Sequence, residues 1–108
     1  MTYLGEFEQV VLLAVVRLAA EAYGTNIRRE IHARAGRAVS IGAAYATLDR
    51  LVDKGYLKAH EIADGPDRGG SARRYFTITK AGIAALENTR TLQARMWDGI
   101  ELNTVRKS

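Results

Sequence analysis

The sequence predicts a small, mainly α-helical domain with one β-hairpin, and three observations lead to this prediction. The chain has 108 residues, which is enough for a single modest core. Over most of its length, apolar residues recur at three- and four-residue steps, the period of an amphipathic helix. Between residues 56 and 78 the pattern changes to alternation on both sides of a turn-rich stretch, which is typical of two strands and their loop.

The first two predicted helices differ in character. The first is expected over residues 4–21, because its apolar residues form one continuous stripe. The second is expected to start at Thr25 or Asn26, both good helix starters, and to end near Gly36. Three arginines lie off its narrow apolar face. The second helix is therefore predicted to be short and basic.

A third helix and a hairpin are predicted next. The helix is expected to run from the N-cap residue Ser40 to about Gly55. Its buried stripe is expected to consist of Ile41, Ala44, Tyr45, Leu48, Leu51 and Val52. Strands are predicted over residues 56–63 and 73–78, and the loop between them is rich in turn formers and holds the only proline.

Thr79 is expected to cap a final helix over residues 80–102, whose first apolar turns contain Ile83 and Leu86. The last residues, 103–108, are expected to form a frayed tail. Residues 1–80 are therefore predicted to be the main domain, and residues 80–102 a helix of the same compact unit.

Composition narrows the class of protein. Apolar residues make up 47% and charged residues 26% of the chain, which is the balance of a globular domain. The absence of cysteine excludes disulfides, thiolate nucleophiles and cysteine-ligated metals. The longest apolar run, Val10–Val16, is too short to cross a bilayer, and the acidic Glu6 and Glu8 do not suit a signal peptide. We expect a cytoplasmic protein.

Enzymatic chemistry finds little support in the sequence. No phosphate-binding glycine loop, nucleophile elbow or paired-histidine zinc motif is present. His32 and His60 are isolated from each other, and we expect no metal site and no cofactor. Asp49 and Asp53 are four residues apart and could form an acid–base pair, but pairing with neighbours such as Arg50 or Lys54 is the simpler interpretation.

The charge distribution favours a polyanionic partner. Sixteen Lys and Arg residues against twelve Asp and Glu residues give a net charge of +4, and twelve of the sixteen are arginine. Residues 24–80 hold eleven basic and six acidic side chains, a surplus of +5. Because arginine suits phosphate oxygens and guanine edges, nucleic acid is the first partner to test. A generic solvated basic surface is the alternative.

The second and third helices predict a helix-turn-helix. In such a unit the second helix enters the major groove of DNA with its amino end first. The residues expected to face the DNA are Ser40, Gly42, Ala43, Thr47 and Arg50, with Thr25 and Asn26 at the start of the preceding helix. Arg50 could reach a guanine edge or a phosphate, whereas Thr47 and Ala43 could contact thymine methyl groups. The alternative is that Gly42 and Ala43 are small because two helices cross closely there.

The hairpin tip supports the DNA interpretation. Arg68, Arg73 and Arg74 flank a segment that contains Ser71, and they could lie along the DNA backbone or in the minor groove. A solvated loop remains the alternative. Three helices, a two-stranded wing and a trailing helix together predict a winged helix-turn-helix with a C-terminal dimerisation helix.

The ordered motifs of the chain resemble those of PadR-type transcriptional regulators. The fragments that carry the resemblance are Leu4-Gly5, Phe7-Glu8, Val11-Leu12, Tyr23-Gly24 with Ile27, Ser40-x-Gly42 with Tyr45, Leu48, Arg50-Leu51 and Gly55, and Arg73-Arg74-Tyr75 with Thr79-x-x-Gly82. The chain departs from the family pattern at Ala46, where proline is common, at Thr25, which replaces a frequent aromatic, and at Gly70-Ser71-Ala72. Its single final helix resembles the shorter branch of the family.

The resemblance implies a homodimeric regulator, a repressor by expectation, that binds double-stranded DNA at an inverted-repeat operator. It also implies a phosphate contact for Tyr45 and DNA contacts for the start of the third helix and the wing. The apolar residues expected at the dimer interface, or in a pocket for an aromatic or hydrophobic effector, are Phe7, Val11, Leu92, Met96, Trp97 and Ile100. For Trp97, ordinary interface packing is the simpler interpretation.

Two other classes of function remain open at this point. A winged helix can bind proteins instead of DNA, and the acidic Asp49 and Asp53 on the predicted reading helix keep that alternative open. A dedicated small-molecule-binding resistance protein on the same scaffold is the other alternative. It would bind DNA only weakly and lose that binding in salt.

Overall fold

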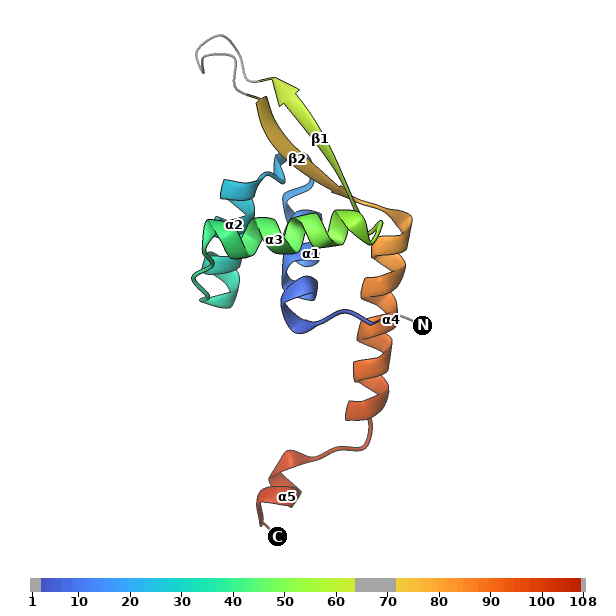
Figure 1. Ribbon diagram of the computed structural model, residues 1–108. Coiled ribbons are helices and arrows are strands. Elements are labelled where there is room, and N and C mark those ends of the chain that lie inside the picture. The colour runs from blue at the N-terminus through green and yellow to red at the C-terminus, as the bar shows by residue number, and fades with distance from the viewer. Residues whose placement is uncertain (1–2, 64–71, 108) are drawn as a thin grey trace.

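The computed structural model describes residues 3–63 and 72–107, and it confirms a mainly helical fold with one hairpin (Figure 1). In chain order, the elements are α1 (Glu6–Leu18), the 3-10 turn η1 (Ala19–Glu21), α2 (Gly24–Ala35), α3 (Ile41–Asp53), β1 (Leu57–Ala63), β2 (Ala72–Ile78), α4 (Lys80–Trp97) and α5 (Leu102–Lys107). The hairpin extends from one end of the helical body, and the carboxyl half of α4 leads away from the other end.

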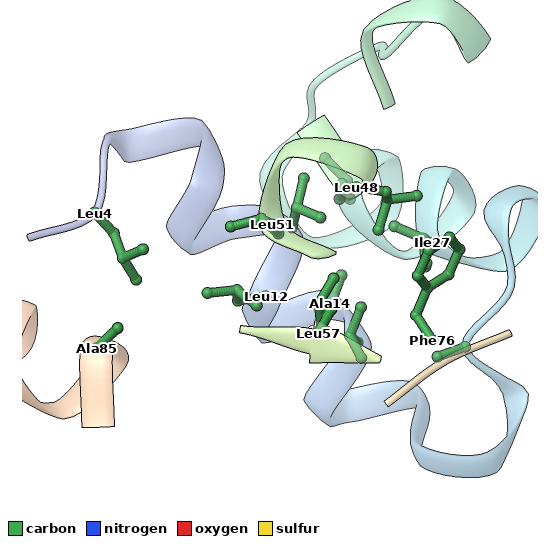
Figure 2. Close-up of a cluster of buried hydrophobic side chains, with 13 residues drawn as sticks. Leu4, Leu12, Ala14, Ile27, Leu48, Leu51, Leu57, Phe76 and Ala85 are labelled. Atoms are coloured by element: carbon green, nitrogen blue, oxygen red, sulfur yellow. The ribbon is translucent and has the colours of Figure 1, made fainter. Parts of the chain in front are cut away.

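One hydrophobic cluster joins the first three helices, the hairpin and the start of α4. Leu12 of α1, Ile27 of α2, Leu48 of α3, Leu57 of β1 and Phe76 of β2 are all fully buried in it (Figure 2). Burial of these apolar side chains supplies the main driving force for assembly. The core therefore holds α3 against α1 and leaves the opposite side of α3 available to solvent.

The first helix is shorter than expected over residues 4–21. It ends at Leu18, because Ala19 adopts a φ of 50° and its N–H donates to the carbonyl of Val15. The chain then makes the short turn η1 before α2. Non-glycine residues rarely adopt positive φ, so the apolar pattern of the sequence did not reveal this break.

The predicted caps of α3 and α4 are confirmed. The Ser40 Oγ accepts a hydrogen bond from the Ala43 N–H at 3.1 Å. The Thr79 Oγ1 accepts from the Gly82 N–H at 3.1 Å and donates to the Gly55 carbonyl at 2.6 Å. Each hydroxyl satisfies a backbone N–H that the helix itself cannot pair, so each helix begins where the sequence predicted.

The two strands form an antiparallel pair in which Leu57 lies opposite Ile78 and His60 opposite Tyr75. The hairpin is tied to the helical body, because the Phe76 N–H donates to the carbonyl of Ala22 at 2.9 Å. Residues 64–71 lie outside the described residues, and with them the predicted turn and the candidate DNA contacts Arg68 and Ser71.

The prediction of one helix over residues 80–102 followed by a frayed tail is wrong. Helix α4 ends at Trp97, Gly99 adopts a φ of 77°, and a second helix, α5, occupies Leu102–Lys107. A glycine in the left-handed conformation commonly terminates a helix. Gly99 was therefore the local signal that could have revealed the break.

Two residues of the predicted apolar stripes are exposed. Ile41, in the first turn of α3, is 59% exposed. Ile83, in the first turns of α4, is 45% exposed. The other predicted stripe residues of α3 are buried or half-buried, as expected.

Candidate nucleic-acid interface

The amino end of α3 presents small side chains and backbone to solvent. Ser40, Gly42 and Ala43 are exposed, and a Cβ added at Gly42 would meet no atom within 4 Å. Gly42 therefore does not relieve a helix crossing, which argues against the alternative explanation for its small size. The surface at this end admits a close approach by another molecule, and its backbone dipoles favour an anion.

The outward face of α3 differs from the prediction at one position. Thr47 was expected to face the DNA, but it is 3% exposed and lies on the side of α3 that packs against the protein. Ala46 and Asp49, which sequence reasoning did not include among the contacts, are exposed instead. Which of these α3 side chains is buried depends on how α3 is rotated about its axis against α1. Residue spacing alone does not give that rotation.

Arg50 is held by α1 in this structure. Its Nε lies 3.6 Å from the Glu8 Oε2, and its Nη2 donates to the Thr47 Oγ1 at 3.3 Å. The same Glu8 oxygen accepts from the Lys54 Nζ at 2.7 Å, and the other Glu8 oxygen accepts from the Gly5 N–H at 3.0 Å. To reach a base edge, the Arg50 guanidinium must leave Glu8, while Lys54 remains as that carboxylate's partner.

The charge of Glu8 depends on these neighbours. Burial by itself raises the pKa of Glu8, but the hydrogen bonds from Lys54 and Gly5 and the positive charges of Lys54 and Arg50 outweigh it. The pKa of Glu8 therefore lies below its ordinary value. An ionised Glu8 ties the start of α1 to the carboxyl end of α3.

Asp49 pairs with the wing and not with its neighbours on α3. The Arg74 Nη1 of β2 donates to the Asp49 Oδ1 at 2.7 Å, and the Arg74 guanidinium lies 5.0 Å from the ring centroid of Phe76. The expected pairing of Asp49 with Arg50 or Lys54 is therefore wrong. Arg74 offsets the negative charge of Asp49 and ties the amino-terminal part of β2 to α3.

Tyr45 joins α3 to the start of α2. The tyrosine ring lies so close to Gly24 that a Cβ at that position would overlap the phenolic hydroxyl. Only glycine permits this contact, which explains the Tyr23-Gly24 motif physically. The contact places the Tyr45 hydroxyl beside the amino terminus of α2, where Thr25 is exposed and Asn26 is half-buried. Hydroxyl and backbone N–H donors together suit a phosphate.

Aromatic rings gather at the middle of the two hairpin strands. Tyr23 and Tyr75 meet edge to face with centroids 5.4 Å apart, and His60 stacks on Tyr75 at 5.9 Å. The Arg73 guanidinium lies 4.2 Å from the ring centroid of Tyr23. Arg73 of the wing strand β2, a DNA contact that the sequence predicted, is thus placed beside the start of α2. Sequence reasoning did not identify the ring cluster, because its members are far apart in the chain.

The predicted interface residues fall into two groups. Met96, Trp97 and Ile100 are 71%, 59% and 51% exposed, and Leu92 is half-buried. Val11, in contrast, is fully buried in the core, so its assignment to a dimer interface or effector pocket is wrong. Phe7 packs partly into the core beneath the Arg37 guanidinium, 4.8 Å from its ring centroid.

The described residues offer no group of three or more His, Asp or Glu side chains arranged to hold a metal ion. Within residues 3–63 and 72–107, no helix has the length and apolar character that a membrane span requires.

Comparisons with known proteins agree with this geometry. The model of the PadR-like family of transcriptional regulators matches residues 12–88. RosR of H. salinarum, in the complex structure of hsRosR-S4, is 26% identical with a TM-score of 0.67, over 95% of this chain and 82% of that chain. A PadR family transcription regulator from Clostridium difficile R20291 is 25% identical with a TM-score of 0.62, over 81% of this chain and 88% of that one.

A third structure supports the fold. F93 from STIV, a winged-helix DNA-binding protein, is 20% identical with a TM-score of 0.71, over 93% of this chain and 100% of that chain. A search of curated proteins finds no significant match. The family match spans more than half of the sequence and covers the ranges of α2, α3, β1 and β2. The chain therefore belongs to the PadR-like family, whose members are winged-helix DNA-binding regulators of transcription and not enzymes.

Proposed function

We propose that this protein is a sequence-specific repressor that binds an inverted-repeat operator as a homodimer and acts in the cytoplasm. The observation that carries the proposal is the exposed, serine-capped and side-chain-poor amino end of α3. Among the described residues, packing does not require glycine at position 42, because an added Cβ would meet no atom within 4 Å. A DNA surface is a partner that such a helix end fits.

Base and backbone contacts follow from the positions of the side chains. Ser40, Gly42 and Ala43 would lie against base edges in the major groove, and Arg50, once it leaves Glu8, would reach a guanine or a phosphate. Tyr45, Thr25 and Asn26 would bind a phosphate at the start of α2. The candidate backbone contacts of the wing are Arg68, Ser71, Arg73 and Arg74.

The acidic side chain at the reading face does not favour a protein partner over DNA. Asp49 is neutralised by Arg74 at 2.7 Å, so this carboxylate does not present an isolated negative charge to a phosphate backbone. This pairing weakens the argument for a winged helix that binds only proteins. The Arg74 guanidinium has five N–H donors, so it could bind a phosphate while its Nη1 stays paired with Asp49.

The dimer is supported by the apolar side chains at the carboxyl end of α4, in the segment that follows it and on the outer face of α1. Met96, Trp97 and Ile100 project beyond the core, and Leu13 and Val16 of α1 are 48% and 47% exposed. In a two-fold dimer, the end of α4 would pack against α1 of the second copy and cover both sets. Two copies of α3 would then lie about 34 Å apart, one turn of DNA.

The same interface would hold an effector. Trp97 and Met96 offer a flat, apolar and polarisable surface to an aromatic or hydrophobic small molecule. Binding there would change the spacing of the two α3 helices and release the operator. Phe7 is a less suitable lining residue, because it already packs against the core and Arg37.

The experiment that tests the proposal is selection of genomic fragments with purified protein, followed by titration of the best fragment against scrambled DNA at two salt concentrations. A specific regulator binds its operator at least about a thousandfold more tightly than scrambled DNA. Recovery of an inverted repeat at that ratio is the expected result. Equal, salt-sensitive binding to both duplexes would contradict sequence-specific regulation.

A further inference from the structure

A basic surface on α2 includes one contact described above, Thr25, and three residues that are not among those contacts. Its members are Thr25, Arg28, Arg29 and His32. Thr25 and His32 each lie three and four residues from the two adjacent arginines, so all four occupy one side of the helix. Together with Ala38 and Val39 they line a notch of about 410 Å³ between α2 and the segment that leads to α3. No acidic side chain is among these lining residues.

Two features make this notch a defined surface. The Arg28 Nε donates to the Val39 carbonyl at 2.8 Å, which holds the guanidinium against the segment before α3. Arg29 and His32 are exposed. A preorganised arginine next to a second, accessible one suits the oxygens of a phosphate group.

The acidic residue of α2 lies on another side of the helix. Glu30 accepts a hydrogen bond from the Arg34 Nε at 3.0 Å, and both residues line a groove against α1. The positive charge of Arg34 is thus offset locally, whereas the lining of the notch contains only basic, hydroxyl and apolar side chains. The two flanks of one short helix therefore differ in charge.

The notch lies beside the end of α3 that would enter the major groove. Ala38 and Val39, which line it, directly precede the cap residue Ser40. Figure 1 shows α2 next to the amino-terminal end of α3. Sugar–phosphate strands border the major groove of DNA. If the amino end of α3 lies in the groove, the protein surface beside that end, which includes the notch, therefore lies close to the DNA phosphates.

We infer that the notch formed by Thr25, Arg28, Arg29 and His32 binds phosphates of the DNA strand that borders the base pairs contacted by α3. This inference rests on the proposed function and adds Arg28, Arg29 and His32 to its contacts. The surface carries no sequence information. It positions α3 on the duplex and contributes equally to binding of operator and unrelated DNA.

The test compares Arg29→Gln with Arg34→Gln, which removes the same charge from the other flank of the same helix. Binding of each protein to the selected operator duplex and to a scrambled duplex is measured by fluorescence anisotropy as salt is raised. Circular dichroism melts establish that both variants remain folded. His32→Gln is a second variant on the notch side.

Loss of one phosphate contact lowers the slope of log affinity against log salt by about 0.9. The affinity ratio of wild type to Arg29→Gln should therefore fall about 3.5-fold between about 50 and about 200 mM salt, on both duplexes. Arg34→Gln should keep the wild-type slope. Equal slopes for the two arginine variants would overturn the inference.

The outcome for the wild type separates this inference from the proposed function. If the wild type prefers its operator but Arg29→Gln behaves like Arg34→Gln, only the notch contact is wrong. If the wild type binds both duplexes equally and Arg29→Gln still lowers the slope, the notch contact stands and sequence-specific regulation fails. A wild type that binds neither duplex overturns both.

Discussion

Replacement of Gly42 by alanine should make the protein more stable and bind its operator less tightly. Gly42 lies in the first turn of α3, and an added Cβ would meet no atom within 4 Å. Its φ is not positive, so alanine is not strained there. Exchange of a helical glycine for alanine then stabilises by about 0.5–1 kcal/mol, because the unfolded chain loses freedom. For a domain of this size the melting temperature should rise by about 2–8 °C.

Binding should change in the opposite direction. If the backbone at Gly42 lies against the floor of the major groove, the new methyl group must displace atoms of a close-packed interface. Overpacking of that kind costs about 1–3 kcal/mol, which weakens operator binding about 5- to 150-fold. Thermal unfolding by circular dichroism measures the first effect, and anisotropy titration of the operator duplex measures the second.

A matched control separates a local contact from a general effect of an added methyl group. At Gly5, the residue before α1, an added Cβ would lie 3.6 Å from the Glu8 Oε1, which is ordinary contact. Gly5→Ala should leave operator affinity unchanged. The reasoning is refuted if Gly42→Ala is stabilised yet binds the operator as tightly as the wild type, since the close approach of α3 to DNA would then not involve this residue.

Three further predictions concern the remaining contacts. Because the pKa of Glu8 is lowered in the folded protein, ionised Glu8 stabilises the fold above the ordinary value of 4.5, and this stabilisation is lost as the pH falls through the lower folded value. Glu8→Gln should therefore remove part of the loss of stability in acid, measured by urea unfolding at several pH values. A variant with the same dependence of unfolding free energy on pH as the wild type would contradict this prediction. Trp97 is the only tryptophan and is exposed, so its fluorescence emission should shift to shorter wavelength when a dimer interface buries it. If sedimentation shows a dimer without that shift, Trp97 lies outside the interface. Gly24→Ala should destabilise the fold by about 1–3 kcal/mol in thermal unfolding, because its Cβ overlaps the Tyr45 ring, and a wild-type melting temperature would disprove that close contact.

The elements of this fold were predictable because their signals are local. A serine or threonine that caps a helix acts on an N–H three residues away, as Ser40 and Thr79 do. The period of apolar residues reports which face of a helix is buried, and alternation reports a strand, before any partner is known. These signals, together with the order of the motifs, were sufficient for the fold class and the family.

The errors at helix ends have a different origin. The break at Ala19 and the division of the last helix at Gly99 depend on single backbone conformations, with φ of 50° and 77°. A continuous apolar pattern extends across both points, so it predicted longer helices than the chain forms. Only the glycine carried a local signal.

The candidate interface required the tertiary structure. Glu8 of α1 meets Lys54, 46 residues away, and Arg50 of α3, which lies one turn before Lys54. Asp49 meets Arg74 across 25 residues of chain. Ion pairs over such separations depend on how helices and strands pack, which residue spacing does not encode. Local signals in the sequence were sufficient to predict the main helices, the two strands, the caps of α3 and α4 and the basic middle of the chain. The packing of α3 against α1 and β2 decided that Thr47 is buried and that Arg50 and Arg74 are already paired, because burial and charge pairing are settled only when distant segments meet.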